Sequence, residues 1–162
     1  MTIDEYLNQP RKLKRKRDRL YEKLLAAEER TAPRDPLNLG DGVPGQRSGS
    51  NTAEEKLLTY IDASSAYREA SRQYTNVRDA LNLAIDNLLY WQGCLIYQVY
   101  IYNVYFDIDD DLKGADEILR TDNRREILAK LGEAKEALAD LLRAQGVEIE
   151  QRTTTENGKT NN

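Results

Sequence analysis

The chain has 162 residues, a formal charge of -4 and no histidine. This length fits one domain with tails, and the modest charge favours neither nucleic acid nor an acidic partner for the chain as a whole. Without histidine there can be no Ser-His-Asp or Cys-His nucleophile and no His ligand for zinc or iron, and the glycines of residues 40–49 have neither Walker nor Rossmann spacing. We therefore expect a protein that is not an enzyme and that has no cofactor, no metal and no small-molecule substrate.

The first predicted element is a basic helix over residues 1–31. Thr2 and Glu5 have the spacing of a capping box, which marks a helix start, and the same spacing recurs in Thr52 with Glu55 and in Asn123 with Glu126. Pro10 suits the first turn of a helix that restarts there. Residues 11–19 hold seven basic residues and one acid. Such a run is either a solvated surface or a contact for phosphates or another acidic partner. The candidate phosphate contacts in it are Arg11, Lys12, Arg15 and Arg19.

Residues 32–51 contain four glycines and three prolines and no apolar period, which predicts a flexible linker. A long helix is then expected over residues 52–106, because apolar residues recur there in heptads. The a positions are Tyr60, Tyr67, Tyr74, Leu81, Leu88 and Leu95, and the d positions are Ala63, Ala70, Val77, Ala84 and Trp91. Such an a/d seam packs against another helix. The partner is either residues 10–30, returned antiparallel by the linker, or a second copy of the chain in a homodimer.

The last part of this long helix, residues 88–106, is uncharged and holds seven aromatic residues. A membrane span is disfavoured because five tyrosines and three amides place polar groups throughout it and no Lys/Arg bias flanks it. The single cysteine, Cys94, forms no intrachain disulfide, as in a reducing compartment, and we expect a cytoplasmic protein. Buried tyrosine rings are typical of cores and protein interfaces, and less often of ligand sites. The candidate partner-binding residues are Tyr90, Trp91, Tyr97, Tyr100 and Tyr105.

Residues 107–146 are expected to form a helix-turn-helix-like pair. A short helix at residues 112–119 is followed by a turn and by a second helix that starts at Asn123, with the period of a buried stripe. In a helix-turn-helix the second helix enters the major groove of DNA. Arg124 and Arg125 would then read bases, and Arg120 and Lys130 would contact phosphates. The alternative is an ordinary helical pair that closes a core, which the excess of acids in this region favours.

Two further segments complete the chain. The acidic run at residues 107–111 lacks the glycine and the final carboxylate of a calcium-binding EF-hand loop, since Leu112 and Ile118 occupy those positions. It is therefore expected to be a solvated loop. The polar tail at residues 147–162 is expected to be disordered. The predicted fold class is thus all-α: an antiparallel helical hairpin with a long heptad-patterned helix, followed by a helix-turn-helix-like pair.

The sequence resembles a family of small phage and prophage proteins from Gram-positive bacteria. The likeness lies in the opening MTIDEYLNQPRKLKRKRDRLYEKL, in the joint VPGQRSGSN, in AIDNL, and more loosely in ADEIL, RTDN and RREILAKLGEAKEAL. The family combines an N-terminal helical hairpin with a C-terminal helix-turn-helix similar to region 4 of RNA polymerase sigma factors, and it usually has a glycine where this chain has Arg120. The resemblance implies a regulator of phage transcription in a bacterial host cell that contacts DNA or RNA polymerase.

Overall fold

The computed structural model describes residues 1–32 and 52–150, and all regular structure in these two ranges is helical. The predicted all-α class is confirmed. The elements are α1 (Ile3–Leu7), α2 (Gln9–Thr31), α3 (Ala53–Ile85), α4 (Tyr90–Tyr97), the π-helical turn η2 (Gln98–Tyr102), α5 (Asn103–Tyr105), α6 (Ala115–Leu119) and α7 (Arg124–Ala144). Across the described part of the chain, none of the helices combines the length and apolar character needed to cross a membrane.

Two compact units make up the chain. The core unit contains Met1–Arg11 and the chain from Arg78 onward, and the paired-helix unit contains Lys12–Val77. The predicted linker at residues 32–51 lies outside the described residues except for its first position. The part of the predicted tail beyond residue 150 lies outside them as well.

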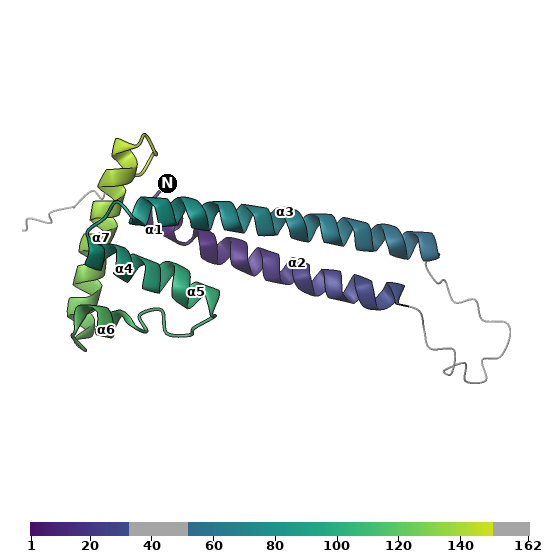
Figure 1. The fold of residues 1–162 in the computed structure, drawn as a ribbon, viewed down its shortest axis with the longest axis horizontal. Coiled ribbons are helices and arrows are strands. Elements are labelled where there is room, and N and C mark those ends of the chain that lie inside the picture. Colours follow the sequence, from purple (N-terminus) through teal and green to yellow (C-terminus); the bar gives the residue numbers. More distant parts are fainter. Residues whose placement is uncertain (33–51, 151–162) are drawn as a thin grey trace, which may run out of the picture. The chain divides into compact units, whose positions relative to one another are not determined.

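In the paired-helix unit α2 and α3 run side by side (Figure 1). The ring centroids of Tyr21 and Tyr67 are 5.4 Å apart, and the guanidinium carbon of Arg17 lies 4.8 Å from the ring centroid of Tyr74. A later residue of α2 thus meets an earlier residue of α3, so the two helices are antiparallel. The heptad positions of α3 in this unit face inward: Ala70 and Tyr74 are buried, and Tyr60, Ala63, Tyr67 and Val77 are partly buried. The α2 helix therefore covers this seam within one chain.

The predicted continuous helix over residues 52–106 is wrong, because the chain leaves helical structure between Ile85 and Tyr90. The side-chain amide of Asn87 donates a 2.8 Å hydrogen bond to the carbonyl of Leu83 and so satisfies a group at the end of α3. The α4 helix then packs closely against this end. A Cβ on Gly93 would lie 3.2 Å from the carbonyl oxygen of Ile85. Glycine at this position lets the two backbones approach.

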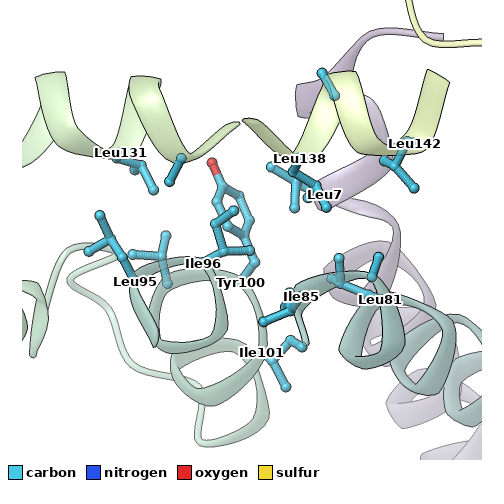
Figure 2. Close-up of a cluster of buried hydrophobic side chains, with 14 of the residues drawn as sticks. Leu7, Leu81, Ile85, Leu95, Ile96, Tyr100, Ile101, Leu131, Leu138 and Leu142 are labelled. Atoms are coloured by element: carbon cyan, nitrogen blue, oxygen red, sulfur yellow. The ribbon is translucent and has the colours of Figure 1, made fainter. Parts of the chain in front are cut away.

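The core unit buries apolar side chains from the end of α3, from α4 and η2, from α1 and from one stripe of α7. In Figure 2, Leu131 of α7 lies opposite Leu95 of α4, Leu138 lies beside Leu7 of α1, and Leu142 lies opposite Leu81 of α3. The predicted stripe of α7 is the buried one, since Ile127, Leu131, Ala134 and Leu138 are buried and Leu141 packs against the core. Burial of this one face holds α7 in place.

The chain after α7 is ordered for longer than expected. Ile149 is buried, Val147 packs against the core, and the backbone amide of Glu150 donates a 3.0 Å hydrogen bond to the carbonyl of Met1. A disordered tail from residue 147 is therefore wrong for residues 147–150. The prediction failed because it rested on the polar composition of the whole tail, in which the two apolar residues Val147 and Ile149 carry little weight.

Two of the predicted helix starts are capped as expected. The Thr2 hydroxyl accepts a 3.1 Å hydrogen bond from the Glu5 amide, and the Glu5 carboxylate accepts one of 2.8 Å from the Thr2 amide. Thr52 and Glu55 form the same reciprocal pair at 3.3 and 3.0 Å. Both capping boxes satisfy amides that the first turn of a helix leaves unpaired.

Candidate functional site

A row of cations follows the outer side of α2. Lys12, Arg15, Arg19 and Lys23 are all exposed, and their spacing of three, four and four residues places them on one helical face. We call this set the α2 ridge. Among the described residues none of its members has an ion-pair partner. Three of the four candidate phosphate contacts in the basic run thus share one exposed face with Lys23, which the sequence reasoning missed although its spacing continues the pattern.

The remaining cations of the basic run are engaged with other groups. Lys14 is buried and its ammonium lies 2.9 Å from the Asp18 carboxylate, which Arg17 also contacts at 2.8 and 3.0 Å. Burial by itself would raise the pKa of Asp18, but hydrogen bonds from Lys14 and Arg17 outweigh it and lower that pKa. The guanidinium of Arg11, the fourth candidate phosphate contact, pairs with Asp111 in the core unit. Arg11 is therefore not an unpaired cation.

The arginines around the α6–α7 turn are exposed, but they are not equivalent. Arg120 ends α6 in the left-handed region with φ of 53°, a conformation that glycine adopts without strain. Arg124 and Arg125 lie in the first turn of α7. The Asn123 side chain accepts a 3.1 Å hydrogen bond from the Arg125 amide and so caps the helix. Positively charged side chains at an exposed helix N-terminus are free to meet an anion.

The predicted helix-turn-helix-like pair is smaller than expected. The first helix covers only residues 115–119 instead of 112–119. The third predicted capping box is incomplete, because the Glu126 carboxylate accepts a 2.9 Å hydrogen bond from the Thr121 hydroxyl instead of reaching the amide of Asn123. Contacts do join α4, α6 and α7 into one packed group.

Lys130 and Trp91 contact each other. The ammonium of Lys130 lies 5.3 Å from the Trp91 ring centroid and 2.9 and 3.1 Å from the two carboxylate oxygens of Glu133. Cations over an aromatic face are attracted by its negative quadrupole. Lys130 thus has local partners, and Trp91, a candidate partner-binding residue, is only partly exposed.

The aromatic residues of the apolar segment divide between the core and the surface. Tyr100 is buried at 8% exposure, so its assignment to a partner-binding surface is wrong. Its ring lies 5.6 Å from the ammonium of Lys135, a partly buried residue that also pairs with Asp4. Other rings of the segment are exposed, and we call these the aromatic surface. They are Tyr90 at 88%, Tyr97 at 43%, Tyr102 at 41%, Tyr105 at 51% and Phe106 at 59%.

The rings at the end of this surface touch. The Phe106 ring centroid lies 4.8 Å from that of Tyr102 and 5.0 Å from that of Tyr105, within the range of favourable aromatic pairs. Sequence reasoning named Tyr90, Tyr97 and Tyr105 but passed over Tyr102 and Phe106. Their membership follows from the fold, because every side of the segment carries aromatic residues and only packing decides which are covered.

A groove of about 530 Å³ lies beside the first part of the aromatic surface. Most of its lining is apolar, and its polar groups are few. The lining residues are Ile85, Asp86, Leu88, Leu89, Tyr90, Gly93, Cys94, Tyr97, Gln98 and Ile118. A hydrogen bond with Cys94 raises the pKa of Tyr90.

The buried side-chain amide of Asn103 and the partly buried one of Gln98 hold the acidic loop that follows the aromatic surface. Asn103, which is 1% exposed, accepts a 3.0 Å hydrogen bond from Gln98 and donates bonds of 2.9 and 3.1 Å to the carbonyls of Asp111 and Lys113. The π-helical turn brings the Gln98 and Asn103 side chains together, because the backbone amide of Asn103 donates a hydrogen bond to the backbone carbonyl of Gln98, five residues earlier. We call this set of bonds the amide clamp.

Comparisons of the chain with protein-family models, with curated proteins and with solved structures find no match. The chemistry of the α2 ridge and of the aromatic surface is therefore the basis for a function. In the described ranges no group of three or more Cys, Asp or Glu residues is placed to hold a metal ion.

Proposed function

We propose that the protein is a non-enzymatic regulator of phage type that acts in the cytoplasm of a bacterial host by contacting nucleic acid. The observation that carries the proposal is the α2 ridge, in which cations follow one another on one exposed helical face without ion-pair partners among the described residues. Residues three or four apart on a helix are neighbours, so these like charges repel one another. A polyanion alongside relieves that repulsion.

The dimensions of the α2 ridge suit a phosphodiester backbone. Lys12 and Lys23 are eleven residues apart, which corresponds to about 16 Å at 1.5 Å per residue. One strand of a duplex presents a phosphate every 3.4 Å along the axis, or about five phosphates over this length. The Tyr21 ring of α2 packs against the Tyr67 ring of α3, so this apolar side of α2 is turned toward α3 and not toward a lipid surface.

Base contacts are assigned to Arg124 and Arg125 at the start of α7. A helix N-terminus with exposed arginines is the part of a recognition helix that reaches base edges, and the resemblance to sigma-like helix-turn-helix proteins supports this role. The alternative target of the α2 ridge and of Arg124 and Arg125 is RNA polymerase. A binding titration with purified polymerase in place of a duplex tests this alternative.

A gel-shift titration with a fluorescent duplex at two salt concentrations tests the proposal. Four phosphate contacts predict that the logarithm of the binding constant falls with the logarithm of salt with a slope of about -3.6. Arg15→Gln with Arg19→Gln should reduce that slope by about 1.8 and weaken binding to every duplex alike. Glutamine has a helix propensity close to that of arginine, so the helix is preserved.

The matched control is Arg124→Ala with Arg125→Ala. This pair should weaken binding to a preferred duplex and leave binding to an arbitrary duplex nearly unchanged. An affinity for duplex that neither pair alters, or that does not depend on salt, would contradict the proposal.

A further inference from the structure

The groove and the aromatic surface of the core unit have no part in the proposed nucleic-acid contact. Tyr90, Tyr97 and Leu89 are exposed at the groove, and Tyr102, Tyr105 and Phe106, which follow in the chain, are exposed as well but do not line it. Exposed aromatic rings of this number are unusual on a protein without a partner, whereas Tyr and Trp dominate the energetics of protein interfaces. A small ligand would fill the groove without reaching Phe106.

The charge around the groove is acidic. Residues 86–122 contain eight acids and two bases. Asp86 lines the groove, and Asp116 and Glu117 are exposed on α6, next to the lining residue Ile118. These three carboxylates have no ion-pair partner among the described residues. A partner that enters the groove with apolar side chains therefore meets unpaired negative charge at its edge.

The geometry points to a docking site for an amphipathic basic segment of a partner protein, with its apolar side chains in the groove against Tyr90 and Tyr97 and its Lys or Arg side chains toward Asp86, Asp116 and Glu117. The volume of about 530 Å³ lies in the range of binding pockets, and its mostly apolar lining with few polar groups is typical of them. Complementary charge at the rim sets the orientation and speeds association.

Cys94 offers a direct reporter, because it is the single cysteine of the chain and lines the groove. The probe is a synthetic amphipathic peptide of Leu and Lys. We expect it to slow the alkylation of Cys94 by iodoacetamide at least fivefold at saturation in the full chain. A peptide of the same pattern with Glu in place of Lys, and a peptide of equal charge with Ser in place of Leu, should leave the alkylation rate unchanged.

Substitutions separate the two halves of the recognition. Tyr97→Ala should weaken binding of the Leu/Lys peptide about tenfold, as expected for an interface anchor. The matched control is Tyr21→Ala, which removes a similarly exposed tyrosine from the paired-helix unit and should leave the affinity unchanged.

The acidic residues are tested by a second set of substitutions. Asp86→Asn with Asp116→Asn and Glu117→Gln should weaken binding of the Leu/Lys peptide and flatten its salt dependence. The control is Glu136→Gln with Glu148→Gln, exposed acids outside the groove, which should do neither.

Several results would overturn this assignment. One is an alkylation rate that the Leu/Lys peptide does not change, and another is equal protection by the Leu/Glu or Ser/Lys peptide. A third is a dimer, seen by light scattering, that Tyr97→Ala dissociates, because the groove would then hold a second copy of the chain. Since none of these measurements involves nucleic acid, their failure is distinguishable from a failure of the proposed function.

Discussion

Asn103→Ala should strongly destabilise the core unit by opening the amide clamp. The substitution removes one hydrogen bond from Gln98 and two to the carbonyls of Asp111 and Lys113. Lys113 keeps a 3.2 Å bond from Gln98, whereas Asp111 loses its bond to the clamp. At about 1 kcal/mol for each hydrogen bond, the free energy of unfolding should fall by about 3 kcal/mol. Typical domains have only 5–15 kcal/mol in total, so the effect is large.

Urea titration followed by the fluorescence of Trp91 measures this change, because Trp91 is the only tryptophan and packs against the core of this unit. The matched control is Gln145→Ala, an exposed amide in the same unit, which should alter stability by less than about 0.5 kcal/mol. A loss of less than about 1 kcal/mol in Asn103→Ala would show that the clamp does not hold the loop, and the account of the π-helical turn would have to be abandoned.

Three further predictions concern backbone fit and pH. Arg120→Gly should be more stable than Arg120→Ala by about 1 kcal/mol in the same titration, because φ of 53° strains the backbone of alanine but not that of glycine. Gly93→Ala should destabilise by about 1 kcal/mol, since its Cβ would crowd Ile85 by more than the gain in helix propensity offsets. From neutral pH to about pH 10 stability should be constant, and it should fall above that range. Burial raises the pKa of Tyr6, and although burial alone would lower the pKa of Lys135, its hydrogen bonds raise it. Both groups therefore lose their stabilising protonated form only in alkali. Lys135→Gln should lower stability at neutral pH and flatten that fall, as urea titrations across pH would reveal.

Elements determined by neighbouring residues could be predicted from the sequence. The capping boxes of Thr2 and Thr52 and the buried stripe of α7 depend on side chains three or four positions apart, and the structure has them as expected. The same holds for the inward side of α3 in the paired-helix unit. In each case the interaction that forms the element is also the pattern that is visible in the chain.

The break between α3 and α4 could not be read from the heptads. Leu88, Trp91 and Leu95 continue the seven-residue pattern and still face the core after the chain has turned. A periodic pattern reports which residues are buried and not whether one helix carries them all. The signals for a break were local: the turn-forming pair of Asp86 and Asn87, and Gly93.

The candidate surfaces were only partly predictable for a similar reason. The spacing of Lys12, Arg15 and Arg19 already placed them on one face, and their exposure agrees with it. By contrast, Arg11 pairs with Asp111, one hundred residues away, and no local pattern indicates that contact. The burial of Tyr100 likewise depends on how α4 and η2 pack against α7.

Gly114 ties the loop after the aromatic surface to one particular side chain. It has φ of 83°, and a Cβ at this position would lie 2.6 Å from the side-chain amide nitrogen of Gln98. The absence of a side chain at position 114 and the long amide at position 98 therefore depend on each other. In proteins descended from the same ancestor, we expect these two positions to change together, so that an alignment of such sequences would reveal the contact without any coordinates.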